Sequence, residues 1–488
     1  MSQIPPIKVI FYELNEVPWQ VIDYFMEETP NSTFAEILRH AHQYTTETHD
    51  SGELHPWSTW PTVHRGVYND THNIRFLNQD IKNTYPPIWE LLTKSKKSVG
   101  LFGSLQSWPV PKQKKQYKFY IPDTFAPSPE TYPESLEAFQ RVNLLQTKKD
   151  GGQTPARIKI SWDSIKDFLS FFDQGFSIKT ALMLAGHLIN EQLNPLYKNL
   201  RPVMQAPVTF DFYYHLLQET HPDFSSYFTN HVAGMMHRYW KYTFPEEFNY
   251  EGTTDEDQFK SRNIIRALKI ADQQLKKLKQ FADAQGYTLM IASSMGQEAV
   301  ERGEYKGELR ITDFDHFYKG IGYEGPVKNN LAMQPDFAFS FKTKQDCEHF
   351  SQLIKAITTP DNEPLFTLKQ AGNTLNCNLK GTTLTLEKQF IYKDALPLGL
   401  DQLGISLIER DPGTGYHQPK GVWIVYKKGL TPVSYREKIE SIQIAPTLLD
   451  LWDIKIPSYM KKPLSLKEAI LQTSSPQAEP ELDFESAH

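Results

Sequence analysis

The sequence predicts an α/β fold, with a largely parallel sheet sandwiched between helices. Short apolar runs of strand length alternate along the chain with longer segments whose apolar residues recur at helical spacing. The alternation begins near the N-terminus and resumes near the C-terminus, which is typical of βα units around one sheet. At 488 residues the chain exceeds one simple core, so we expect one large fold with insertions.

The expected elements follow in chain order. The predicted strands are "KVIFY" (8–12), "SVGLFGS" (98–104), "FSSYFT" (224–229), "YTLMIASS" (287–294) and "GVWIVYKKG" (421–429). The predicted helices are "VPWQVIDYFMEE" (17–28), "PIWELLTKSKK" (87–97), "HVAGMMHRYW" (231–240), the long segment 261–286 closed by a glycine, and "SIQIAPTLLDLW" (441–452). In such a sheet, functional sites form at the carboxyl ends of the strands.

Two regions break this rhythm and divide the chain. We expect the core of the fold to be built from residues 1–124, 223–330 and 400–470. Residues 125–222 read as a helical cap insertion that covers the cleft, and 330–400 as a small α+β insertion. The polar, acidic tail 473–488 is expected to be mobile.

Composition excludes several classes of protein. The net charge of −6 argues against a general nucleic-acid binder, which needs a basic face. Two cysteines provide neither a disulfide framework nor a cysteine-based zinc site. We find no secretory leader and no apolar run long enough to span a membrane, so we expect a cytoplasmic protein whose partner is a small-molecule or glycan substrate. The oligomeric state cannot be read from the sequence.

Five segments in order carry a resemblance to a known family. They are "VIFYELNEVPWQVID", "PWSTWPTVHRGVYNDTHNI", "PPIWELLTKSKKSVGLFGSLQSWP", "GTGYHQPKGVWIVYKKG" and "SIQIAPTLLDLWDIKIPSYMKKPL". Together they resemble the alkaline phosphatase superfamily, in the branch of type I phosphodiesterases and nucleotide pyrophosphatases. The chain also looks like a bacterial subgroup with Asn-Glu after the first strand and an Asn-His…His-Arg-Tyr-Trp helix.

The segment "STWPTVHRG" resembles the nucleophile segment of that family. Pro61 suits the first turn of a helix, so the residues before it would lie where free N–H groups attract an anion. The resemblance places Thr59 at the nucleophile position, and Thr62 is an alternative nucleophile or substrate binder. The alternative is that a threonine only caps the helix. His64 is a candidate acid–base group or ligand.

A carboxylate ends the first strand. Glu13 stands where the family has a metal-binding Asp, so it is a candidate metal ligand or catalytic partner of a histidine. Asn15 and Glu16 are close enough along the chain to reach the same cleft. The alternative is a buried carboxylate bonded to backbone amides.

The helix of residues 231–240 supplies further candidates. His237 matches a metal-binding His of the family, whereas Ala233 stands where the partner Asp would be. Together with aromatic and amide side chains of other segments, this region yields the expected substrate-binding set, which comprises Asn15, Trp57, Trp60, Asn230, His231, Arg238, Trp240 and Gln297.

Six positions decide whether the chain could bind the two metal ions of the family's site. The family's two-metal site would need ligands at Glu13, Ala233, His237, Ser294, Met295 and His417, and three of these cannot bind a metal. We therefore expect no two-metal centre, and either one divalent ion, zinc or manganese, held by Glu13, His237 and His417, or none.

Three functions remain open at this point. The first is a phosphoester hydrolase or transferase, of phosphodiester or nucleotide type, with a rebuilt or reduced metal site. The second is a metal-independent sugar or nucleotide-sugar transferase of bacterial saccharide metabolism. The third is a non-catalytic, ligand-binding pseudoenzyme. Metal content separates the first from the others, and turnover separates the last two.

Overall fold

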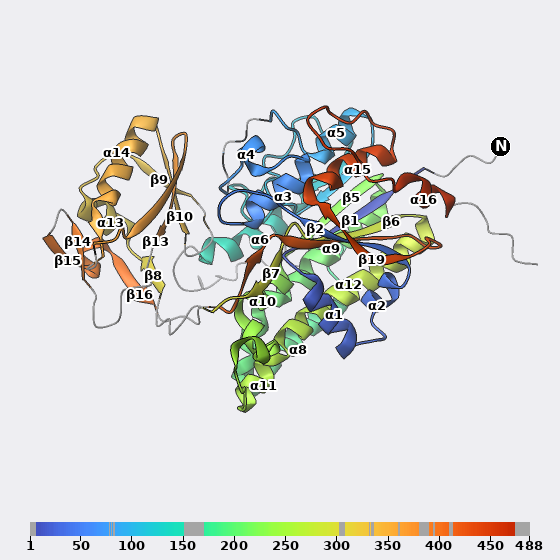
Figure 1. Ribbon diagram of the computed structural model, residues 1–488, viewed down its shortest axis with the longest axis horizontal. Coiled ribbons are helices and arrows are strands. Elements are labelled where there is room, and N and C mark those ends of the chain that lie inside the picture. Colours follow the sequence, from blue (N-terminus) through green and yellow to red (C-terminus); the bar gives the residue numbers. More distant parts are fainter. Residues whose placement is uncertain are drawn as a thin grey trace, which may run out of the picture.

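In the computed structural model, an eight-stranded sheet lies between two layers of helices (Figure 1). The structure describes residues 6–473 except 78, 80, 82, 151–169, 302–307, 331, 333–335, 360–361, 380–389, 394–395 and 409–412. The predicted tail from 474 onward lies outside the described residues, as does part of the predicted helical insertion.

The sheet has the strand order β19-β2-β18-β6-β1-β5-β3-β4. Of its eight strands, β18 runs opposite to the others, so the predicted largely parallel sheet is confirmed. The strands are β1 (Val9–Leu14), β2 (Ala41–Glu47), β3 (Val99–Phe102), β4 (Tyr117–Ile121), β5 (Phe224–Thr229), β6 (Thr288–Ala292), β18 (Lys420–Tyr426) and β19 (Val433–Glu440).

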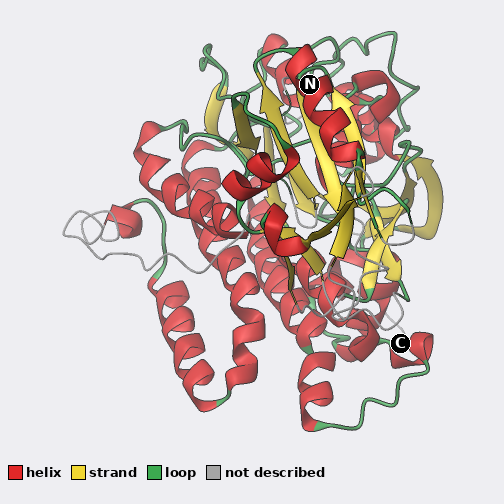
Figure 2. Cartoon of the chain, turned by 90° about the vertical axis from the view of Figure 1, so that its left-hand side faces the viewer, coloured by secondary structure: helices red, strands yellow, loops and turns green. Residues whose placement is uncertain are grey.

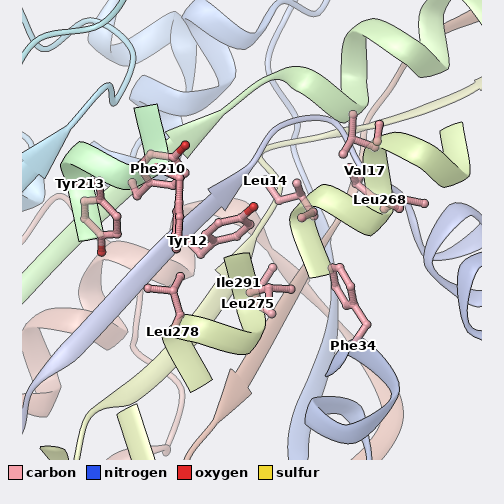
Figure 3. Packing of buried hydrophobic residues seen from close by; sticks show 14 of the residues in the cluster. Tyr12, Leu14, Val17, Phe34, Phe210, Tyr213, Leu268, Leu275, Leu278 and Ile291 are labelled. Carbon is pink, nitrogen blue, oxygen red and sulfur yellow. The ribbon is translucent and has the colours of Figure 1, made fainter. Parts of the chain in front are cut away.

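Alternation along β1 divides the core into two layers. Ile10, Tyr12 and Leu14 join one hydrophobic cluster, whereas Val9 and Phe11 join the other, because successive side chains of a strand point to opposite faces. Figure 3 shows the first cluster, in which Tyr12 and Leu14 pack with side chains from several helices. That face is covered by α1 (Trp19–Glu28), α2 (Thr33–Leu38), α9 (Gln205–Thr220), α10 (His231–Thr243) and α12 (Asn263–Gln285).

The opposite face is covered by a smaller group of helices. They are α3 (Pro56–Arg65), α5 (Ile88–Lys94), α15 (Ile444–Leu451) and α16 (Lys467–Gln472), and Figure 2 shows helices on both sides of the sheet. The predicted helical cap differs from the structure. Its helix α9 packs into the main cluster through Phe210 and Tyr213, so it forms part of a sandwich layer.

A second, smaller lobe has its own core and lies beside the sandwich in Figure 1. Its hydrophobic cluster begins at Leu309, earlier than the predicted boundary at 330, and ends at Ile405. Its elements are β8 (Glu308–Ile311), α13 (Phe314–Ile321), β9 (Val327–Asn330), β10 (Asp336–Phe341), α14 (Lys344–Lys355), β11 (Ile357–Thr358), β12 (Phe366–Ala371), β13 (Thr374–Leu379), β14 (Phe390–Lys393), β15 (Leu396–Gly399) and β16 (Ile405–Ile408).

A two-stranded ribbon connects this lobe to the sandwich. It consists of β7 (Gly296–Ala299) and β17 (Gly415–Gln418), which pair antiparallel and flank the lobe in sequence. Gln297 and His417 are opposite each other in this ribbon. Among the described residues, none of the helices combines the length and hydropathy needed to cross a membrane.

Candidate metal centre

The turn after β1 directs a second carboxylate into the protein. Glu16, the third residue after Glu13, adopts a left-handed backbone conformation with φ of 61° and is 2% exposed. Such a φ is uncommon for a non-glycine residue and is found at functional turns. The turn aims the carboxylate at α10 and at the ribbon that leads to the small lobe.

Three nitrogen atoms converge on one oxygen of Glu16. Its Oε2 lies 3.0 Å from His237 Nε2, 3.3 Å from His417 Nε2 and 2.5 Å from Gln297 Nε2. The other oxygen, Oε1, accepts a hydrogen bond of 2.8 Å from Asn15 Nδ2. Residues from the turn after β1 and from α10, β7 and β17 thus meet at a single carboxylate.

A glycine allows the ribbon to approach the helix. His237 Nδ1 lies 2.8 Å from Gly415 O, which can only accept, so Nδ1 carries the proton. A Cβ on Gly415 would lie 2.5 Å from Met236 O, so a larger residue there would push β17 away from α10. The contact fixes the ring of His237 with Nε2 toward Glu16, and Nε2 of a neutral ring then offers a lone pair.

Burial and the neighbouring side chains act in opposite directions on the pKa values of Glu16 and His417. Burial alone would raise the pKa of Glu16, but the adjacent His417 and His237 hold that pKa well below its usual range. Conversely, burial would lower the pKa of His417, and the Glu16 carboxylate outweighs this effect and raises it. The carboxylate is therefore ionised and available as a ligand at neutral pH.

The donor set fits a divalent metal ion. Glu16, His237 and His417 each offer one ligand atom, and these atoms lie within 4.8 Å of one another. Two imidazole nitrogens and one carboxylate oxygen form a typical three-ligand zinc set that leaves a fourth position open. The hydrogen bonds that His237 donates to Gly415 O and that Gln297 donates to Glu16 are the outer contacts that orient such ligands.

Glu13 does not belong to this cluster, contrary to the ligand set expected from the sequence. Its Oε1 lies 3.1 Å from His64 Nε2 and accepts a 2.8 Å hydrogen bond from Ser104, and all three side chains are buried. Alternation along β1 sends Glu13 to the face covered by α3, whereas α10 packs on the opposite face. Glu16, and not Glu13, is the carboxylate that lies beside His237 and His417.

The predicted nucleophile segment begins its helix earlier than expected. Helix α3 starts at Pro56, so Pro61 lies inside it and Thr59 occupies the second half of its first turn. The amide of Thr59 bonds to His55 O at 2.9 Å and is not free to bind an anion. The hydroxyl of Thr59, which is fully buried, lies 2.8 Å from Ser294 Oγ.

Thr62 belongs to a buried network that fastens α3 to the following turn. Its hydroxyl lies 2.8 Å from both carboxylate oxygens of Asp50 and 3.0 Å from His72 Nε2. Because His72 Nδ1 accepts from the amide of Ile74, the neutral ring carries its proton on Nε2 and donates to Thr62. Burial, together with the charge of Arg65, lowers the pKa of His72 to about 3, so this ring is a donor and not a base for Thr62.

Four of the predicted binding residues lie together beside Glu16. Trp60 Nε1 donates to Asn15 Oδ1 at 2.8 Å, and Asn15 Nδ2 lies 2.6 Å from Asn230 Oδ1. Gln297 bonds directly to Glu16. Asn230 is exposed, so this chain of amides runs from the buried carboxylate to the surface.

The remaining predicted binders have other contacts. His231 uses both ring nitrogens, on Thr229 and on the carbonyl of Ala267, and burial lowers its pKa to about 4. The buried Trp240 donates to the exposed Glu247, and Trp57 donates to a backbone carbonyl. His231 and Trp240 are therefore structural residues of α10. Arg238 is exposed, and its predicted role stays a prediction.

A rim of residues surrounds His417, and apart from Trp57 the sequence did not single them out. The ring of His55 lies edge-on to His417 at 5.9 Å and stacks on Trp57 at 4.3 Å. Burial lowers the pKa of His55 to about 4, so this ring is neutral at pH 7. Glu53 accepts from Tyr416 and lies 3.9 Å from Lys369 of the small lobe. No motif signals these residues, because they come from three separate segments.

No family model and no curated protein matches the sequence. Solved structures that match include human ectonucleotide pyrophosphatase/phosphodiesterase 5, with 12% identity over 93% of this chain and 97% of that chain and a TM-score of 0.43. Wild-type alkaline phosphatase PafA matches with 10% identity, coverages of 96% and 99%, and a TM-score of 0.48. Phosphonoacetate hydrolase from Sinorhizobium meliloti 1021, in complex with phosphonoformate, matches with 11% identity, coverages of 96% and 96%, and a TM-score of 0.40.

The chain is similar to alkaline phosphatase superfamily proteins. At these identities and scores the similarity carries no information about chemistry, which rests on the side chains of this protein.

Proposed function

We propose that this protein is a phosphoester hydrolase or transferase that uses one divalent metal ion, zinc or manganese, held by Glu16, His237 and His417. The observation that carries the proposal is the convergence of two imidazole nitrogens on one carboxylate oxygen, with the proton of His237 fixed on the far side of its ring by Gly415. A divalent ion bound there would polarise a phosphoryl oxygen and lower the pKa of a bound water.

The residues around the ligands have distinct tasks in this proposal. Asn15 and Gln297 hold the two oxygens of Glu16, which keeps its carboxylate oriented toward the histidines. His237 is 29% exposed and is the ligand through which the site opens to solvent. His55 is neutral and can accept a hydrogen bond from water or from a substrate hydroxyl near His417.

Water or an acceptor hydroxyl, rather than Thr59, is the attacking group in this proposal. Thr59 is fully buried, and its hydroxyl is engaged with Ser294. A nucleophile must be within reach of the reacting phosphorus atom, and the exposed side of this site lies at His237 and Asn230. Arg238, which follows His237 in the chain and is exposed, is the proposed binding group for the anionic substrate.

Hydrolysis of bis-p-nitrophenyl phosphate and p-nitrophenyl phosphate tests this function. The protein is stripped with a chelator and assayed before and after addition of Zn²⁺ or Mn²⁺. We expect activity only with metal, its loss in His237→Ala, and its retention in Glu53→Gln, a control carboxylate on the rim. A metal-independent rate, or equal activity of His237→Ala and the native protein, would contradict the proposal. A protein that binds metal but turns over neither ester would favour the non-catalytic alternative.

A further inference from the structure

Helix α8 (Ile178–Leu193) has its polar side inward and its apolar side outward. Its buried residues are Thr180, His187 and Glu191. Four large apolar side chains face solvent, with exposed fractions of 69% for Ile178, 68% for Leu182, 61% for Ile189 and 78% for Leu193. Lys179, Asn190 and Gln192 of the same helix are exposed as well. A surface helix of a monomer normally shows the reverse pattern.

Ion pairs fix this orientation. His187 Nε2 lies 2.9 Å from Glu191 Oε1, and Arg201 binds both oxygens of Glu191 at 2.8 and 2.6 Å. Arg201 belongs to η2 (Pro195–Met204), the 3-10 segment that follows α8. Because Arg201 binds both oxygens of the buried Glu191, rotation of the helix to hide the leucines would take this carboxylate away from Arg201.

The exposed face is symmetric about its own midpoint. Ile178, Leu182, Ala185, Ile189 and Leu193 recur at spacings of three and four residues, so they form one stripe along the helix. Reversal of the helix about the point between Ala185 and Gly186 exchanges Ile178 with Leu193 and Leu182 with Ile189. The two residues at the midpoint, Ala185 and Gly186, are small. A Cβ on Gly186 would meet nothing within 4 Å.

We propose that α8 is a dimer interface, in which the α8 helices of two copies of this chain pack antiparallel about a two-fold axis near Ala185 and Gly186. Each large apolar side chain then meets a large apolar one, and the small residues allow the helices to cross closely. An interface of this kind is isologous, the commonest arrangement in soluble oligomers. The stripe forms its apolar centre, and Leu188, which is 58% exposed, adds to it.

The charges near the stripe favour a second copy over a lipid surface. The five stripe residues are uncharged, and the exposed charged residue of α8 is Lys179, near its N-terminal end. In the antiparallel dimer, Lys179 lies next to the C-terminal turn of the partner's α8, where the helix dipole is negative. A helix that binds an anionic membrane would instead carry several basic side chains along its flanks.

Sedimentation of the full-length protein over a wide range of concentration tests the proposal. We expect a dimer that the double variant Leu182→Glu/Ile189→Glu converts to a monomer, with a dissociation constant raised at least 100-fold. Leu396→Glu is the matched control, because Leu396 is 69% exposed but lies in the small lobe. It should leave the dimer intact, and all variants should keep the native melting temperature within a few degrees.

Single cysteines test the register of the pair. Ala185→Cys should form a disulfide between two copies on mild oxidation, because each copy of residue 185 lies at the axis. Leu193→Cys should not link to itself, since the two copies would lie about 22 Å apart at 1.5 Å per residue over fifteen residues. It should link when mixed with Ile178→Cys. The native Cys347 and Cys377 are buried and should not compete.

A monomeric native protein at every concentration would overturn the proposal, as would self-linking of Leu193→Cys. A monomer that binds vesicles of phosphatidylglycerol and phosphatidylcholine through the stripe would assign the face to a membrane instead. Both results are independent of the proposed metal site, because α8 contributes none of its ligands.

Discussion

Two glutamates, three residues apart at the end of β1, occupy opposite environments. Glu13 is the fifth residue of the strand and faces α3, where it meets His64 and Ser104 in a fully buried cluster. Glu16 lies in the turn and faces α10 and the ribbon, where it meets two histidines, one of which is partly exposed. The first cluster is closed to solvent, and the second opens to it.

The comparison shows that the strand and the turn place their side chains by different rules. Alternation fixes the face of every strand residue, so Glu13 could reach only the α3 layer. A left-handed turn residue escapes this constraint, and Glu16 could therefore be directed toward the opposite layer. We infer that Glu13 supports the fold and that Glu16 supports the chemistry.

The largest expected effect separates the two acids directly. Glu16→Gln should lower kcat/KM for bis-p-nitrophenyl phosphate at least about 100-fold, because it removes a charged ligand of the proposed metal ion. Loss of a residue that only orients a ligand typically lowers activity about 10–100-fold, and loss of the ligand itself should lower it more. Glu13→Gln should change that constant by much less. Steady-state kinetics of the two isosteric variants, assayed at saturating metal, measures the difference. Equal losses would show that the two clusters act as one site.

The same pair should show the opposite order in stability. Glu13→Gln disturbs a buried carboxylate that accepts from both His64 and Ser104, so we expect the free energy of unfolding to fall by about 1–3 kcal/mol. Urea titration of the metal-free proteins measures this without a contribution from bound metal. A Glu16→Gln variant that is the less stable of the two in this titration would contradict the division.

Gly415→Ala tests whether the ribbon must touch α10. The added Cβ would lie 2.5 Å from Met236 O, so β17 should shift and carry both His417 and the carbonyl that orients His237. We expect metal affinity about 10–100-fold weaker, measured by competition with a chelating dye. Gly234→Ala is a suitable control, because a Cβ there meets nothing within 4 Å. Unchanged metal affinity in Gly415→Ala would show that the hydrogen bond between His237 and Gly415 O is not needed for metal binding.

Acid should destabilise the fold through a histidine outside both clusters. The pKa of His231 is about 4 in the folded protein, below the ordinary value of 6.5, because the neutral ring is buried. The unfolded chain therefore binds its proton first, so stability is complete above pH 6.5 and falls as the pH drops toward 4. The melting temperature of His231→Gln should decline less over that interval than that of the native protein. An identical decline would assign the acid sensitivity to other groups, such as His72.

The smallest effect is expected at Thr59. Thr59→Val keeps the shape of a buried side chain and removes only the bond to Ser294, so activity should stay within a few-fold of the native value. Complete loss of activity, with metal still bound, would restore this residue as the nucleophile that the family resemblance implies.

Periodicity alone predicted much of the fold. The apolar runs at β1 and β6 and the helical spacing of α12, which ends at Gly286 in a left-handed conformation, appear where they were expected. The start of α3 was misjudged, because both Pro56 and Pro61 suit a first turn and only the tertiary contacts select Pro56.

Sequence motifs predicted the histidines of the candidate site. They did not predict the carboxylate, because its position depends on the backbone conformation of a turn. His237 and His417 were found from family-like segments far apart in the chain, and the structure brings them to one carboxylate. That carboxylate is Glu16 because of a φ of 61°, which no periodicity reveals. Asp50, Ser104 and His55 were missed for a related reason, since each contributes through contacts with distant segments.

Elemental analysis of three purified proteins tests the central claim most directly. The native chain, Glu16→Gln and Glu13→Gln are dialysed against the same zinc or manganese buffer and analysed for bound metal per chain. We predict one ion in the native protein and in Glu13→Gln, and none in Glu16→Gln. Metal retained in Glu16→Gln but lost in Glu13→Gln, or a native protein that binds none, would contradict the account.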